Sequence, residues 1–279
     1  MSLSLRDELR VVIYRDQIQI VRIGRQLTLR GIQSRILEKK SFPISIADGT
    51  NPDAAIQALE SALSGLEKKP AFASVILSNH FMNYAMVELN QSLNGEDEEQ
   101  AYAKHCFVQL YGAGAESWEI RLNRDDSGTR QLASALDAAF LQNLRAAFAR
   151  AGIKLKSVQP CLMAAFNNSL SELQNQNAWF VLFENESLCV GLVKQGSLNS
   201  VRTLNVDHNW LEKLTEILDR ESYLSDCDIV SDKIFLWAPE FVKTDMPQSA
   251  RWKIQKVKPE IRAGFAPDFE ERFALALCN

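Results

Sequence analysis

The 279-residue sequence lacks the long apolar run that a transmembrane helix requires. No stretch approaches the roughly 20 apolar residues that cross a bilayer, and the longest apolar runs have the length of a β-strand. Residues 1–10 carry charges of both signs without an apolar centre, unlike a signal peptide. The sequence therefore predicts a cytoplasmic protein without direct membrane insertion, for which any recruitment to the inner membrane goes through a partner.

Cysteine and histidine are scarce, and their spacing excludes the common metal and disulfide frameworks. The five cysteines are odd in number and no two have a CxxC spacing. Most lie in apolar contexts, where a free cysteine behaves as a small hydrophobe, which favours a reducing compartment. His105 and Cys106 are neighbours and would point to different faces of a helix. Because His80 and His208 also lack a ligand at zinc spacing, we expect no metal site.

Clustered positive charge is missing as well. The chain has 31 Lys and Arg against 35 Asp and Glu, a net charge of −4 and a pI of about 5.6. The longest basic runs, Lys39-Lys40 and Lys68-Lys69, are too short to follow a phosphate backbone. The five tryptophans are dispersed, which is typical of core packing and not of a platform for stacked bases. We therefore expect no nucleic-acid partner.

The pattern of apolar residues repeats between the two halves of the chain and indicates an α/β fold. In the first half we expect strands over 9–14, 17–23, 26–29 and 35–42, a helix from Asn51, and a strand over 72–77. In the second half we expect strands over 179–183, 188–193 and 199–204, a helix over 208–224, a strand over 233–237 and a weaker one over 252–257. No flexible linker separates the halves, so we expect them to be packed together.

Residues from about 80 to 122 interrupt this repeat and are predicted to form a small inserted subdomain. It would comprise a strand over 81–89, a helix with acids in its first turn after Gly95, and a strand over 118–122, followed by a turn over 125–128. We expect the helix to bury an apolar face made of Tyr102, Ala103, Cys106, Phe107 and Leu110. A strand over 131–136 leads on from this segment.

Three further helices are predicted. One covers 137–151, with Phe140, Leu144 and Phe148 on a buried stripe and Gly152 at its end. A strand over 154–158 follows it. The second helix is expected to run from Pro160 to Leu173, and the third from Asp268 to Cys278.

Four stretches resemble a known family. Residues 95–103, GEDEEQAYA, look like the start of its inserted helix, and residues 151–160, AGIKLKSVQP, are similar to its passage into the second lobe. Residues 179–202 match its second set of meander strands, and residues 273–277, FALAL, look like its closing segment. The family is that of the PilM, MshI and GspL cytoplasmic proteins of type IV pilus and type II secretion machines, within the actin and Hsp70 superfamily.

The resemblance implies an actin/Hsp70-like ATPase fold, made of duplicated ribonuclease-H-like subdomains with a small insertion. Its first lobe would cover residues 1–158, including the insertion at about 80–122, and its second lobe residues 159–279. The C-terminal segment of the second lobe would pack back on the first lobe.

Active members of this fold hold nucleotide with three loops, which are degenerate here. Glycine lets the backbone approach phosphate closely, yet the hairpins at 14–17 and 183–187 contain none. In the third loop a proline fixes φ and removes an N–H donor. The resemblance thus implies a pseudo-ATPase scaffold or adaptor with no catalytic residue, no cofactor and no metal, whose degenerate cleft positions are Asp16, Gln17, Glu184, Asn185, Glu186 and Pro239.

Two enzymatic alternatives stay open. One is a functional ATPase or sugar-kinase-type phosphotransferase that binds ATP and Mg²⁺ through altered loops. The other is a ribonuclease-H-like nuclease that holds metal ions with Asp16, Glu184 and Glu186, although such sites normally use three or four acids. Solvated turn acids are the simpler interpretation of these residues.

The resemblance also implies a protein partner, the short N-terminal cytoplasmic peptide of a bitopic inner-membrane protein, bound in a groove beside the insertion. The strand of mixed polarity over 81–89 could take up such a peptide by strand addition. Its candidate contact residues are Met82, Tyr84 and Met86. The alternative is that the insertion only lengthens the first lobe.

Overall fold

The computed structural model describes residues 7–28, 31–44, 52–68, 70–89, 95–123, 130–225, 231–261, 264–265 and 269–278. The predicted turn over 125–128 and the predicted helix starts at Asn51 and Asp268 lie outside these residues. Two compact units make up the chain. Unit 1 comprises Met1–Phe81, Asp137–Ala164 and Pro259–Asn279, and unit 2 comprises Met82–Leu136 and Ala165–Lys258.

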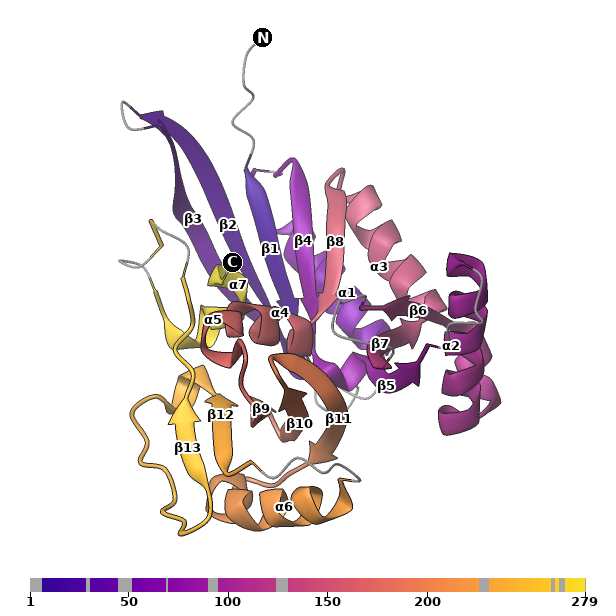
Figure 1. The fold of residues 1–279 in the computed structure, drawn as a ribbon. Helices are drawn as coiled ribbons and strands as arrows, with labels where there is room; N and C mark the ends of the chain where they lie inside the picture. The colour runs from indigo at the N-terminus through magenta and orange to yellow at the C-terminus, as the bar shows by residue number, and fades with distance from the viewer. Residues whose placement is uncertain are drawn as a thin grey trace. The chain divides into compact units, whose positions relative to one another are not determined.

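Unit 1 is built on a five-stranded sheet in the order β3-β2-β1-β4-β8 (Figure 1). Strands β1, β2 and β3 form an antiparallel meander, and β4 and β8 follow parallel to β1. The strand bounds are Glu8–Ile13, Gln17–Thr28, Gly31–Pro43, Phe72–Leu77 and Lys154–Pro160. The predicted strands over 17–23 and 26–29 are therefore parts of one long strand. Leu9, Val11, Val12 and Ile13 of β1 are fully buried, as expected for a central strand with both faces covered.

Helices α1, Pro52–Ser64, and α3, Ala138–Arg150, pack against each other and against this sheet. The Asp137 carboxylate caps α3 by accepting the backbone N–H of Phe140 at 2.9 Å. Gly152, with φ of 72°, follows the end of the helix. Phe140, Leu144 and Phe148 are buried, which confirms the predicted stripe.

The C-terminal segment also belongs to unit 1. Its short helices, Glu271–Phe273 and α7, Ala274–Leu277, lie against β1 and β2. Arg10 donates hydrogen bonds to the carbonyls of Ala276 and Cys278. The helix predicted over 268–278 is shorter in the described residues, and its first turn is of the 3₁₀ type. Residues 273–278 are all buried, so this run fills core space and has no polar helical face.

Unit 2 contains a second five-stranded sheet in the order β11-β10-β9-β12-β13, with the same connectivity as the first. Strands β9, β10 and β11 form an antiparallel meander, and β12 and β13 follow parallel to β9. The bounds are Ala178–Glu184, Ser187–Lys194, Ser197–Asn205, Lys233–Trp237 and Lys253–Lys256. The predicted α/β class and the predicted duplication of strand order are therefore confirmed.

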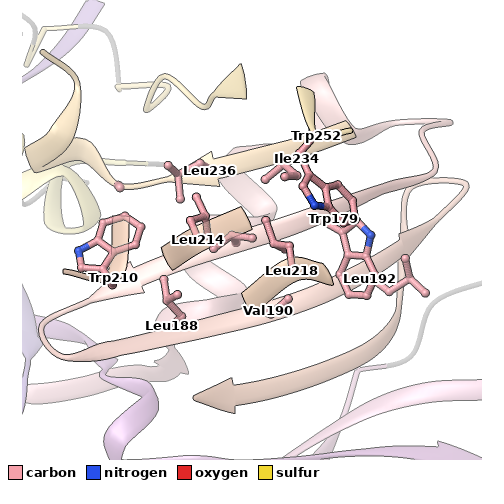
Figure 2. Close-up of a cluster of buried hydrophobic side chains, with 12 residues drawn as sticks. Trp179, Leu188, Val190, Leu192, Trp210, Leu214, Leu218, Ile234, Leu236 and Trp252 are labelled. Atoms are coloured by element: carbon pink, nitrogen blue, oxygen red, sulfur yellow. The ribbon is translucent and has the colours of Figure 1, made fainter. Parts of the chain in front are cut away.

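One face of this sheet is closed by α6, Trp210–Leu224. Trp210, Leu214 and Leu218 recur every four residues and meet Trp179 and Val190 of the strands in a single buried cluster (Figure 2). On the other side Phe166 of α4, Cys161–Asn168, meets Phe180 edge to face. The helix predicted over 160–173 is broken into α4 and α5, Leu170–Leu173. The break is at Ser169, whose hydroxyl donates to the Ala165 carbonyl at 2.7 Å and competes with the helical backbone bond.

The inserted residues form a three-stranded sheet, β5-β7-β6, covered by α2. The bounds are Asn83–Glu88, Arg130–Asp137, Trp118–Leu122 and, for α2, Glu96–Tyr111. Ala103 and Phe107 of α2 are buried against this sheet, but Tyr102 and Leu110 are exposed, so the predicted apolar face was too wide. These residues group with unit 2 by contact, whereas the sequence placed them in a lobe at 1–158; the lobe division stays a prediction.

We expect Phe148→Ala to lower the free energy of unfolding of unit 1. The ring is fully buried in the α3 stripe, and large-to-small changes at such sites cost about 3–5 kcal/mol. Chemical denaturation measures the change, with the half-exposed Leu170→Ala as a control that should cost far less. A loss below about 1 kcal/mol for Phe148→Ala would show that the stripe is not core.

Candidate functional site

The first degenerate loop is the turn between β1 and β2. The Tyr14 N–H donates to the Gln17 carbonyl at 2.8 Å and closes the turn, which places Arg15 and Asp16 at its tip and Gln17 at the start of β2, all half-buried. The Asp16 carbonyl accepts the N–H of Ile44 at 2.7 Å, the residue that follows β3. The tip is thus tied to the chain that leaves the meander.

The second degenerate loop repeats this arrangement in unit 2. Asn185 and Glu186 form the turn between β9 and β10, and the Glu186 carbonyl accepts the N–H of Val206, which follows β11, at 2.9 Å. Glu186 has a φ of 60°, a left-handed conformation in which a side chain other than glycine is strained. The duplication therefore extends to the hydrogen bond that fixes each hairpin, while glycine is absent from both turns.

Glu184 is buried at the end of β9, with 6% of the residue exposed. Burial, together with the charge of Glu184, raises the pKa of the neighbouring Cys189 thiol to about 12, although a hydrogen bond from Thr203 opposes the shift. Cys189 is therefore an inert thiol at neutral pH. Within the described residues no group of three or more His, Cys, Asp or Glu side chains could hold a metal ion.

The third degenerate loop follows β12. Pro239 begins a single 3₁₀ turn, Pro239–Phe241. The Lys256 ammonium then donates to the carbonyls of Phe241 at 2.9 Å and Val242 at 2.8 Å, and also to that of Thr244. The loop is therefore clamped by a cation from β13.

Aromatic rings fill the space between this loop and the second hairpin. The Phe183 ring stacks on Trp210 with centroids 4.3 Å apart, and Phe241 meets both rings edge to face at 5.2 and 5.3 Å. The three rings belong to the core of unit 2. The backbone beside Glu184 and the backbone after Pro239 are thus held together by packed side chains.

A groove of about 510 Å³ lies within unit 2, beside two edge strands. One is β5, the edge of the inserted sheet, and the other is β11, the edge of the larger sheet; they lie side by side but belong to different sheets. The C-terminal ends of α2 and α6 complete the walls. The lining residues include Tyr84, Met86, Leu110, Tyr111, Arg130, Trp179, Val190, Val201, Arg202, Glu221 and Leu224.

Three exposed apolar or aromatic side chains lie along the groove. Leu110, Tyr111 and Leu224 are 64%, 44% and 51% exposed and all line it. Tyr111 is held in place because its hydroxyl donates to the Tyr84 carbonyl at 2.7 Å and its ring stacks on Phe107. Burial raises the pKa of this hydroxyl, so it stays a donor across the physiological range. Aromatic and apolar side chains gathered at a groove are typical of a binding surface.

Charged side chains also line the groove, and an ion-pair network surrounds Glu221. This side chain is only 4% exposed, and Arg202 and Arg220 approach its carboxylate oxygens at 3.5 and 3.2 Å. Arg130 lines the groove as well and lies 3.9 Å from Glu88. The lining charges are therefore two arginines and one buried, compensated acid.

The predicted partner residues have different positions. Tyr84 and Met86 are two residues apart on β5, and both line the groove. Ala85 and Val87 belong to the buried core of the inserted sheet. Met82 is buried before β5 begins and is not among the lining residues. Sequence reasoning missed Trp179, Arg202 and Glu221, because nothing local in the sequence indicates that β9, β11 and α6 meet β5.

None of the helices in the described part of the chain is long and apolar enough to cross a membrane. No family model and no curated protein matches the sequence.

Solved structures of similar fold include the PilM–PilN type IV pilus biogenesis complex, with a TM-score of 0.64 and 14% identity over 97% of this chain and 96% of that chain. A Bacteroides thetaiotaomicron protein with an actin-like ATPase fold and unknown function gives 0.61 and 10% over 99% and 97%. The cytoplasmic domain of EpsL, an inner membrane component of the type II secretion system of Vibrio cholerae, gives 0.57 and 9% over 90% of each chain. The chain therefore has the predicted actin-like ATPase fold, and PilM is among the structures that it resembles.

We expect Lys256→Met to destabilise the loop after β12. The change removes hydrogen bonds from a charged donor to three carbonyls, and each such bond contributes about 1.5–3 kcal/mol at most. Limited proteolysis within residues 241–250 should become faster, and unfolding should begin at lower denaturant. Lys253→Met, whose side chain is 75% exposed on the same strand, is the matched control. Equal behaviour of the two variants would show that the clamp does not hold the loop.

Proposed function

We propose that this chain is a non-catalytic scaffold or adaptor in the assembly of a type IV pilus or type II secretion-like machine. In this proposal its actin-like fold has lost nucleotide hydrolysis. It acts in the cytoplasm, recruited to the inner membrane by binding a cytoplasmic peptide of a membrane protein. The observation that carries the proposal is the groove of unit 2, because exposed apolar side chains and arginines gathered in one groove are suited to a protein ligand.

The state of the three loops supports a scaffold without nucleotide. Backbone N–H groups in glycine-rich turns make the anion-binding concavities that hold phosphates. Here the turns present Asp16, Asn185 and Glu186, and acids at these places would repel a triphosphate. Pro239 has no N–H to offer, and Lys256 is committed to loop carbonyls and not to a ligand.

The shape and chemistry of the groove support an extended peptide as the ligand. Tyr84 and Met86 of β5 and Val201 and Arg202 of β11 all line the groove, so a peptide bound there would meet both apolar and charged side chains. The volume of about 510 Å³ lies in the usual range for ligand pockets, roughly 300–1,000 Å³. Strand addition to β5 could supply main-chain hydrogen bonds.

The structures of similar fold support the cellular setting. One is a complex of PilM with PilN in type IV pilus biogenesis, and another is the cytoplasmic domain of an inner membrane component of a type II secretion system. In each case the matched region covers at least 90% of the solved chain and of this chain. We infer a partner of the same kind here, a bitopic inner-membrane protein with a short cytoplasmic segment.

Calorimetric titration with ATP and Mg²⁺ tests the loss of the nucleotide site. We expect no saturable binding at micromolar concentration, because the turns offer carboxylates where phosphate requires donors. Saturable binding that is lost in Asp16→Ala would overturn the scaffold-only proposal and favour a phosphotransferase. Binding of Mg²⁺ or Mn²⁺ alone that depends on both Asp16 and Glu184 would favour a nuclease.

Site-specific photocrosslinking tests the groove. A photoreactive phenylalanine analogue in place of Met86 or Leu224 should crosslink, in cells, to the cytoplasmic segment of an inner-membrane protein. The same analogue in place of Leu170, which is exposed outside the groove, is the control. Mass spectrometry identifies the crosslinked peptide. Equal crosslinking from all three positions, or crosslinks confined to proteins without a membrane segment, would contradict the proposal.

A charge substitution measures how much the groove contributes. Val201→Glu should weaken affinity for the crosslinked segment by about 30-fold or more, the effect of losing an interface hot spot. Leu170→Glu should leave it unchanged. Circular dichroism of both variants checks that unit 2 is folded. If Val201→Glu binds as well as the wild type, the segment does not occupy this groove.

A further inference from the structure

The hairpin of β2 and β3 projects beyond the sheet of unit 1. Glu8, the first residue of β1, pairs with Ile23, so residues 24–28 of β2 pair with β3 alone. Figure 1 shows the hairpin running past the ends of β1, β4 and β8. At roughly 3.3 Å per residue this overhang extends about 16 Å. A two-stranded ribbon of this kind has no sheet neighbour on which to bury its side chains.

An apolar pair occupies the outer part of this overhang. Leu27 of β2 lies directly opposite Ile32 of β3, and the two are 64% and 53% exposed. Closer to the sheet the hairpin is covered, because Leu37 packs over Gly24. The exposed pair is therefore an uncovered apolar patch and is not a continuation of the core.

The same end of the sheet carries an excess of positive charge. The starts of β1, β4 and β8 are tied side by side, since the Ala71 N–H donates to the Asp7 carbonyl and the Lys154 N–H donates to the Ala71 carbonyl. Among the described charged side chains on these strand ends, the hairpin overhang and the loop before β4, the exposed cations are Arg25, Arg35, Lys68, Lys154 and Lys156. Glu67 is the one exposed acid in that set.

Apart from Glu67, the described acids at these strand ends are already engaged in ion pairs. Glu8 is buried and accepts from Arg10 as well as Arg25, each at 3.2 Å. Asp7 lies 3.5 Å from Arg22. Lys156 lies over the Phe72 ring, 3.3 Å from its centroid, which adds an aromatic face to the same end. This cationic end contrasts with the net charge of −4 of the whole chain.

We propose that this end of unit 1 is a peripheral membrane-binding surface for bilayers with anionic headgroups. In this arrangement Leu27 and Ile32 enter the boundary between headgroups and acyl chains, and the lysines and arginines beside them meet the lipid phosphates. The apolar pair favours a membrane over nucleic acid, because a phosphate backbone gives an exposed leucine and isoleucine nothing to bury against. Each cation near an anionic surface contributes about fivefold to partitioning, the equivalent of ~1 kcal/mol.

Vesicle co-sedimentation tests the proposal without any partner. The full chain should sediment with vesicles of phosphatidylglycerol and phosphatidylethanolamine, and not with vesicles of phosphatidylcholine alone. Binding should fall as salt rises from about 0.05 to 0.5 M, because the screening length shortens. Lys154→Gln/Lys156→Gln should bind about 25-fold more weakly at low salt.

The apolar pair is tested separately. Leu27→Ser/Ile32→Ser should bind anionic vesicles at least about fivefold more weakly and keep the salt dependence of the wild type. The matched control, Leu170→Ser/Lys194→Gln/Lys243→Gln, removes exposed apolar and cationic side chains from unit 2 and should bind like the wild type. All substituted side chains are exposed, so melting temperatures should stay close to that of the wild type.

Two outcomes would overturn the proposal. One is a failure of the wild-type protein to sediment with anionic vesicles at low salt, which would favour an acidic protein as the ligand of this end. The other is wild-type affinity in either of the two unit 1 variants, which would show that the charges or the apolar pair play no part. This surface shares no residue with the groove of unit 2, so a failure of peptide binding in the groove does not count against it.

Discussion

The burial of one central strand in each sheet constrains everything else in this protein. Strands β1 and β9 are each bonded on one side to an antiparallel partner and on the other to a parallel one. Because both faces of such a strand are covered, its central positions are apolar, as they are over 11–13 of β1 and 178–183 of β9. The turns that follow these two strands are consequently placed at the same position in each half of the repeat, even though the two halves differ in sequence elsewhere.

The repeat keeps the same backbone geometry in both halves, although neither turn contains glycine. Each turn is still held by the N–H of the residue that leaves the third strand, Ile44 in unit 1 and Val206 in unit 2. The hydrogen bond uses only backbone atoms, so it tolerates any side chain at the tip. Glu186 adopts a left-handed conformation there at the expense of local strain. Backbone hydrogen bonds and core packing are therefore enough to fix both turns, whatever side chains they carry.

The surfaces that remain available for function arise where sheet edges are left without partners. In unit 2 the edges of β5 and β11 lie side by side without pairing, and the groove occupies that discontinuity. In unit 1 the overhang of β2 and β3 leaves Leu27 and Ile32 without a covering layer. Natural sheets usually blunt such edges with charge, and the arginines and lysines found at both places are of that kind. Here the same residues also supply the chemistry of the two proposed surfaces.

The sequence by itself determined the α/β class, the duplicated strand order and the buried stripe of Phe140, Leu144 and Phe148. These features are local: apolar residues repeating every second or every third to fourth residue report the burial of a strand or helix directly. The sequence also located both hairpin turns, because short polar segments separate apolar strands there. The predicted apolar face of α2 was too wide, and the predicted last helix was too long. Burial in each helix depends on the tertiary contacts that cover it, which the sequence pattern does not report.

Only the tertiary structure decided where side chains distant in the sequence come together. Arg202 and Glu221 join Tyr84 in one groove, although more than a hundred residues separate them from it, and no local pattern encodes that meeting. Likewise, the basic pair Lys39-Lys40 is not part of the cationic surface, because Lys39 is bonded to Glu270 and Lys40 to Glu38. Apart from Lys68, the exposed cations come from separate strands of the sheet. Periodicity reports whether a residue is buried, but strand pairing decides which residues become its neighbours.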